Sequence, residues 1–144
     1  MNIETVLKGK GLQVETTIPD TGILDAAQQM RARRVGCLVV SRDGRHIDGI
    51  ISERDIVLGL AREGEKLLHM RASQLMIKSV ITCAPTDSIG HVMAVMTERR
   101  VRHLPVVEGG QLCGLISIGD IVKNRLEELE LQNGVLRDVY LAGH

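Results

Sequence analysis

The residues best suited to bind a ligand form a Ser-x-x-Asp motif, which occurs at Ser52 to Asp55 and again at Ser117 to Asp120. A Ser with an acidic residue three positions later is also a capping box, so helix capping alone explains either copy. The free N–H groups at the start of such a helix attract phosphate, and the carboxylate beside them accepts hydrogen bonds from sugar hydroxyls. The motif therefore predicts either two capped helices or two binding sites.

An internal repeat places both motifs at the same position in two similar halves of the chain. A shift of 66 residues aligns the halves, and the shift becomes 65 after a one-residue gap. The aligned pairs include Pro19 with Pro85, Met30 with Met96, Val40 with Val106, and Asp55 with Asp120. Such self-similarity indicates two copies of one structural unit. We expect the copies at residues 1–72 and 73–144, within a length sufficient for one compact domain.

Each copy predicts the element order βαββα, which gives an α+β fold of tandem repeats with small sheets packed against helices. The expected features are first strands at residues 14–18 and 80–83, hairpin turns at Asp43-Gly44 and Gly109-Gly110, and final helices from Ser52 and Ser117. The charged residues 62–78 are expected to link the copies.

The first helix of each copy is predicted from an apolar stripe with i, i+3, i+4 and i+7 spacing. Short polar residues mark the helix starts, Asp20 and Thr21 in one copy and Asp87 and Ser88 in the other. The stripes are Ile23, Ala26, Ala27 and Met30 in the first copy, and Ile89, Val92, Met93 and Met96 in the second.

Composition excludes several classes of function. Lys and Arg number 18 and Asp and Glu also 18, so no basic surface for nucleic acid is expected. Tyr140 is the one aromatic residue, which excludes aromatic stacking platforms. The three cysteines have no disulfide or zinc spacing, and no apolar run is long enough to span a membrane. We expect a cytoplasmic protein without a metal site.

The two repeats resemble the CBS domain family, through GIISERD at residues 49–55, GLISIGD at residues 114–120, and RHLPVV before the second hairpin. The resemblance covers nearly the whole chain. It implies a CBS domain pair, or Bateman module, that binds an adenine nucleotide such as AMP, ADP, ATP or NAD, or S-adenosylmethionine. It also implies a regulatory role, with an enzyme or transporter as the unknown partner, and no catalytic residues.

Candidate ligand-binding residues follow from the motif and from the resemblance. Asp55 and Asp120 would accept hydrogen bonds from ribose, with Ser52 and Ser117 assisting. The resemblance implies that aliphatic walls hold the adenine, although ordinary core packing also explains a buried Val. The full set is Val14, Thr16, Val35, Gly36, Cys37, Ser52, Arg54, Asp55, Val80, Thr82, Val101, Arg102, His103, Ser117, Gly119 and Asp120.

The two sites are expected to differ in where their basic groups lie. Arg54 in the first corresponds to Gly119 in the second, whereas Arg102 and His103 correspond to Gly36 and Cys37. Either arrangement suits phosphate, because a guanidinium makes bidentate contacts and a histidine adds a donor. A solvated basic surface is the alternative explanation.

A long amphipathic helix is predicted at residues 118–141, with Gly134 expected to interrupt it. Its apolar positions include Ile121, Val122, Leu126, Leu129 and Leu136. The stripe either packs on its own domain or extends a homodimer interface, and the resemblance implies a dimer. Two alternatives to a nucleotide sensor stay open, a structural scaffold with vestigial sites and, with no catalytic motif found, an enzyme.

Overall fold

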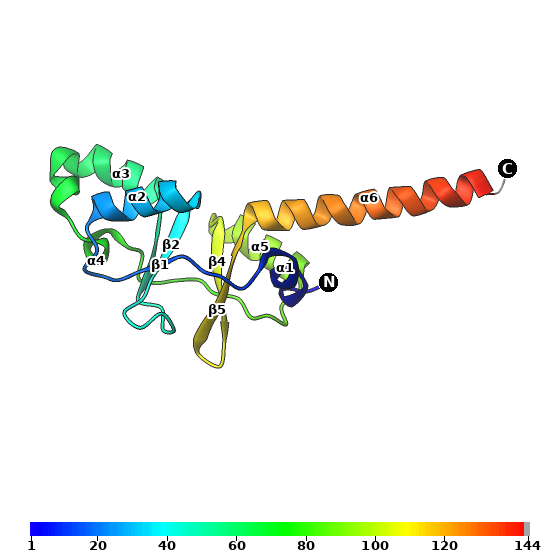
Figure 1. Cartoon of the computed structure of the whole chain (residues 1–144), viewed down its shortest axis with the longest axis horizontal. Coiled ribbons are helices and arrows are strands. Elements are labelled where there is room, and N and C mark those ends of the chain that lie inside the picture. The colour runs from blue at the N-terminus through cyan, green and yellow to red at the C-terminus, as the bar shows by residue number, and fades with distance from the viewer. Residues whose placement is uncertain (143–144) are drawn as a thin grey trace.

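The computed structural model describes the backbone of residues 1–142 and the side chains of residues 1–134. Both copies contain the predicted first helix, hairpin and final helix (Figure 1). The elements are α1 Ile3–Lys10, β1 Thr16–Thr17, α2 Ile23–Arg33, β2 Cys37–Val40, β3 Gly49–Ser52, α3 Glu53–Glu63, the 3-10 helix η1 Gly64–His69, α4 Ala72–Leu75, α5 Ile89–Arg99, β4 His103–Glu108, β5 Gln111–Ser117 and α6 Ile118–Ala142.

Two small sheets lie at the centres of the two copies. In the first, β1 is parallel to β2, and β3 is antiparallel to β2; in the second, β4 and β5 form an antiparallel hairpin. The turn of that hairpin, Gly109-Gly110, has positive φ angles of 59° and 78°, as a two-residue type I′ turn requires. The predicted mixed fold of helices and small sheets is confirmed.

Helices bury an apolar core against each sheet. The predicted stripes are buried at three of their four positions, which are Ile23, Ala26 and Met30 on α2, and Ile89, Val92 and Met96 on α5. The fourth position was predicted wrongly, since Ala27 is only half-buried and Met93 is 41% exposed. On a helical wheel the i+4 position lies roughly 70° from the centre of the other three, at the margin of the buried face.

Each copy is completed by a segment that precedes the other copy in the chain. We call residues 1–10 the first leading segment and residues 70–79 the second leading segment. The first packs on the second copy and the second on the first copy; Figure 1 shows α1 beside α5 and α6, with α4 beneath α2. Their buried residues are Ile3, Val6 and Leu7 on α1, and Ala72 and Leu75 on α4. The sequence predicted only a linker at residues 62–78, so this exchange is new.

The backbone contacts of the two leading segments are reciprocal. The Ile3 N–H donates to the Asp87 carbonyl at 2.9 Å, and the Ala72 N–H donates to the Thr21 carbonyl at 2.7 Å. Thr21 and Asp87 are matching residues of the repeat, so both leading segments dock in the same way. The two copies are therefore interlocked rather than merely adjacent.

Two matching glycines let the leading segments approach the sheets. A Cβ atom at Gly114 would lie 2.8 Å from Leu7 Cδ2, and one at Gly49 would lie 2.6 Å from Met76 Sδ. Packed carbon atoms keep about 3.5 to 4.0 Å between them. A side chain at either glycine would therefore displace the leading segment that packs on it.

The first strand of the second copy is absent, and the prediction for residues 80–83 was wrong. In the first copy the Val39 N–H donates to the Glu15 carbonyl at 3.1 Å and helps to pair β1 with β2. The residue that matches Val39 is Pro105, which has no N–H to donate. Only Cys83 forms an isolated bridge to β4. The loss of one donor explains why the pairing stops there.

Two helix boundaries also differ from the sequence prediction. Gly22 is the N-cap of α2 and makes no side-chain cap, so the start marked by Asp20 and Thr21 was wrong, whereas Ser88 caps α5 as predicted. The helix α6 continues through Gly134 instead of breaking there. A glycine costs a helix only about 1 kcal/mol relative to alanine, and strong helix formers flank this one. Within residues 1–142, no helix has the length and apolarity to cross a lipid bilayer.

Candidate functional site

The first site is built where β3 ends and α3 begins. Ser52 is the N-cap of α3, and its Oγ accepts a hydrogen bond from the Asp55 N–H at 3.3 Å. Asp55 Oδ2 accepts from the Ser52 N–H and from the Ser52 hydroxyl, both at 2.9 Å. The capping box is therefore confirmed. It uses one carboxylate oxygen, and among the described residues nothing donates to Asp55 Oδ1.

The second site repeats this arrangement where β5 meets α6. Asp120 Oδ2 accepts from the Ser117 N–H at 2.9 Å, and Ser117 Oγ accepts from the Asp120 N–H at 3.1 Å. One additional group enters this site, since the ammonium of Lys10 donates to the same Asp120 Oδ2 at 2.6 Å. Burial raises the pKa of Asp120, but the bonds from Lys10 and Ser117 outweigh it and hold the pKa below its ordinary value.

The stretches predicted to hold a base lie directly beside the two motifs. Cys37 pairs with Ser52 across β2 and β3, and His103 pairs with Ser117 across β4 and β5. The first N–H group of α3 donates to the carbonyl of Gly36, the residue before Cys37, at 3.0 Å. The first N–H group of α6 donates to the carbonyl of Arg102, the residue before His103, at 2.8 Å. The fold thus brings residues 35–37 to the first motif and residues 101–103 to the second.

Other predicted residues are less closely tied to the motifs. Val14 and Thr16 are half-buried at the start of the first sheet; Val80 is half-buried and Thr82 exposed, outside any strand. Arg54 is exposed on α3, without a hydrogen bond or ion pair to any described residue. For these positions a role in ligand binding stays a prediction.

The two sites approach each other where Gly36 of the first copy lies near His103 of the second. A Cβ at Gly36 would lie 3.5 Å from Glu53 Oε1 and 3.8 Å from His103 Cε1. Burial, with the nearby charges of Lys10 and Arg102, lowers the pKa of His103, although Asp120 and Glu53 act in the opposite direction. His103 is therefore mainly neutral at pH 7 and offers one donor and one acceptor.

Cys37 lines the first site as a neutral thiol. Burial, reinforced by the negative charge of Asp55, raises its pKa to about 12, although Lys10 opposes this shift. A thiol with such a pKa is a poor nucleophile. Cys37 is therefore a buried, unreactive group beside the first motif, and its role as a wall of a ligand site stays a prediction.

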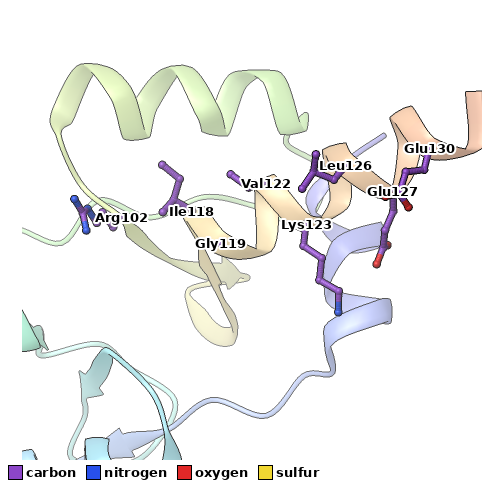
Figure 2. A pocket seen from close by; sticks show the side chains of 8 residues that line it. All are labelled: Arg102, Ile118, Gly119, Val122, Lys123, Leu126, Glu127 and Glu130. Carbon is purple, nitrogen blue, oxygen red and sulfur yellow. The ribbon is translucent and has the colours of Figure 1, made fainter. Parts of the chain in front are cut away.

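A surface groove of about 670 Å³ lies along α6 next to the second site. Figure 2 shows Ile118, Val122 and Leu126 along the helix, with Arg102 at the end of the groove near Gly119. A smaller hollow of about 290 Å³ lies between α1 and α6 and reaches Lys10 and Asp120. In Figure 2 the Lys123 side chain extends from α6 toward α1, and Lys123 lines both hollows.

Sequence reasoning missed the part of this site that α1 supplies. The spacing of Ile3, Val6 and Leu7 at i, i+3 and i+4, after an Asn2 cap, would have indicated an amphipathic helix. Nothing in the sequence, however, pairs Lys10 with Asp120, because the repeat contains no lysine at the position that matches Lys10. That contact depends on the exchange of leading segments.

Comparison with known proteins identifies the family. The family model described as "CBS domain" matches residues 13–62 and 72–127, which covers both repeats. The chain belongs to the CBS domain family. CBS domain pairs are regulatory modules, and Lys10 lies outside both matched ranges.

Three similar proteins match this chain over most of their own length. The mitochondrial CBS domain-containing protein CBSX3 of Arabidopsis thaliana is 31% identical over 96% of this chain and 73% of its own. The crystal structure of the CBS-domain containing protein ATU1752 from Agrobacterium tumefaciens is 40% identical, covers 87% of this chain and 99% of its own, and gives a TM-score of 0.84. The CBS domain pair of MJ0100, solved with 5′-methylthioadenosine and S-adenosyl-L-methionine, is 21% identical over 85% of this chain and 98% of its own, with a TM-score of 0.75.

Proposed function

We propose that this CBS domain pair senses an adenosine-containing ligand of the AMP, ADP, ATP or NAD class and thereby regulates a separate partner protein. The observation that carries the proposal is that only one oxygen of each motif carboxylate is used by the capping box. In both copies the capping box engages Oδ2 alone, at a helix start beside the end of a strand. A ribose diol would donate to the carboxylate while the first N–H groups of the helix attract phosphate.

The walls of both sites suit a purine in a chain with one aromatic residue. Val35 and Val101 are half-buried at matching positions beside the motifs, and Cys37 is neutral. Aliphatic side chains cover the faces of a base through apolar burial. The CBS domain pair of MJ0100 accommodates two adenosine compounds on the same fold, which supports this choice of ligand class.

A thermal-shift screen of AMP, ADP, ATP, NAD and adenosine, with GMP as the control, tests the proposal. A ligand at 100 times its Kd adds about 2.7 kcal/mol of stability, which raises Tm by several degrees. Asp55→Asn and Asp120→Asn should fold but respond less, since Asn still caps a helix and has lost the charge. No shift with any adenosine compound would favour a scaffold, and turnover of a compound would favour an enzyme.

The apolar face of α6 also supports a homodimer. Val122, Leu126 and Leu129 are 50%, 55% and 49% exposed and lie on one side of the helix. The predicted stripe residue Leu136 lies outside the described side chains. An isologous contact would cover this stripe in both copies. Light scattering at micromolar concentration should give twice the monomer mass, and a monomer mass would contradict the dimer.

A cytoplasmic location stays a prediction from the sequence.

A further inference from the structure

The pair formed by Lys10 and Asp120 is the most shielded ion pair among the residues that the structure describes. The two side chains are 33% and 22% exposed, and the ammonium also donates to the Leu115 carbonyl at 2.7 Å. Every other ion pair in this part of the chain has at least one side chain that is more than half exposed. Lys10 is thus held at the motif carboxylate by two acceptors.

At the first site, no cation among the described residues pairs with the motif carboxylate. Asp55 accepts hydrogen bonds only from Ser52, within the described residues. The reciprocal docking of the leading segments aligns Asn2 with Arg71, and hence Lys10 with Ser79, which is exposed. One position in the leading segments therefore makes the two sites unequal.

We propose that Lys10 is an intramolecular competitor for the ribose-binding carboxylate of the second site, so that the first site fills before the second. This inference rests on the proposed function. A ribose diol that engages both oxygens of Asp120 must displace the ammonium from Oδ2, whereas at Asp55 it has to displace only the neutral Ser52 hydroxyl. We expect the first site to bind ligand roughly tenfold more tightly than the second. A tenfold ratio corresponds to about 1.4 kcal/mol, close to the free energy of the weakest charge-assisted hydrogen bonds.

The surroundings of Lys10 allow its ammonium to move without undocking α1. The helix is anchored by Ile3, Val6 and Leu7, which are at most 6% exposed, and the lysine stem has four rotatable carbons. The hollow between α1 and α6 is also lined by Asn124 and Glu127, whose side chains carry two other acceptor groups. Asn124 Oδ1 is buried and has no hydrogen-bond partner among the described residues. The displaced ammonium therefore has a second place to bind.

The ion pair itself is tested without any ligand. Carbon-detected NMR titration of the Asp120 carboxyl should give a higher pKa in Lys10→Met than in the wild-type chain. Lys8→Met is the matched control, because Lys8 lies on the same helix, is 75% exposed, and pairs with Glu4 at 3.8 Å. An Asp120 pKa that does not change in Lys10→Met overturns the inference, whatever the function of the site.

Competition is tested by calorimetry with adenosine, a neutral probe, in an Asp55→Asn background that leaves the second site to report. Lys10→Met should bind adenosine roughly tenfold more tightly than the background protein, while Lys10→Arg and Lys8→Met should match it. Circular dichroism verifies that each variant is folded, and Lys10→Arg keeps the charge if Lys10→Met proves unstable. Equal or weaker binding by Lys10→Met overturns the competition alone. Absence of binding in every protein, wild type included, both for adenosine and for AMP, ADP, ATP and NAD, overturns the proposed function and the competition with it.

Discussion

Docking of the first leading segment should contribute a large share of the stability of the second copy. Leu7 is 3% exposed and packs on the backbone of Gly114. Truncation of a buried leucine costs about 2 to 5 kcal/mol, so Leu7→Ala should lower the urea midpoint by roughly 1 to 2.5 M for a slope of about 2 kcal/mol/M. Leu12→Ala, at a position that is 67% exposed, is the control and should change stability by less than about 0.5 kcal/mol.

A double-mutant cycle tests the contact itself. Gly114→Ala alone should cost about 1 to 3 kcal/mol, because its Cβ would lie 2.8 Å from Leu7 Cδ2. In the double variant the clashing methyl groups of Leu7 are gone, so the combined loss should be smaller than the sum by at least about 0.5 kcal/mol. A Leu7→Ala variant as stable as the Leu12→Ala control, or strictly additive losses, would refute the packing of α1 on the second sheet.

Three further predictions follow from the same structure. Gly49→Ala should destabilise at least as much as Gly114→Ala in urea unfolding, because the added Cβ would meet not only Met76 Sδ but also the Ile77 carbonyl oxygen at 3.0 Å, a backbone atom. Cys37 and Cys83, whose pKa values burial raises to about 12, should resist iodoacetamide at pH 8 until the protein is denatured, as peptide mass mapping would reveal. Because the pKa of His103 is lowered on folding, its contribution to stability is complete above about pH 6.5 and declines as the pH falls toward the folded value. Unfolding free energies at pH 7.5 and 5.5 should therefore differ less in His103→Gln than in the wild type.

Local patterns in the sequence predicted the parts of the fold that depend on nearby residues. The Ser-x-x-Asp motifs mark the starts of α3 and α6 because a capping box joins groups only three residues apart. The apolar spacing of α2 and α5 likewise predicted most of the buried positions. Both signals appear twice, and each repeat supports the other.

The features that the sequence did not predict depend on distant partners. The strand expected at residues 80–83 is lost because Pro105, more than twenty residues later, lacks the N–H that Val39 supplies in the first copy. The contact between Lys10 and Asp120 joins residues 110 positions apart. Such pairs leave no local pattern, so the asymmetry of the two sites emerges only from the folded chain.

The exchange of leading segments has a consequence for how the protein is made. The first copy has all of its parts once residue 79 has left the ribosome, whereas α1 finds its full partner surface only after Ile121 has emerged. At about 5 to 20 residues per second, the apolar side of α1 waits roughly 6 to 20 seconds for its place in the second core. The copies that look alike in the folded molecule are thus unequal during translation, and the nascent chain carries an uncovered apolar helix until the second copy has emerged.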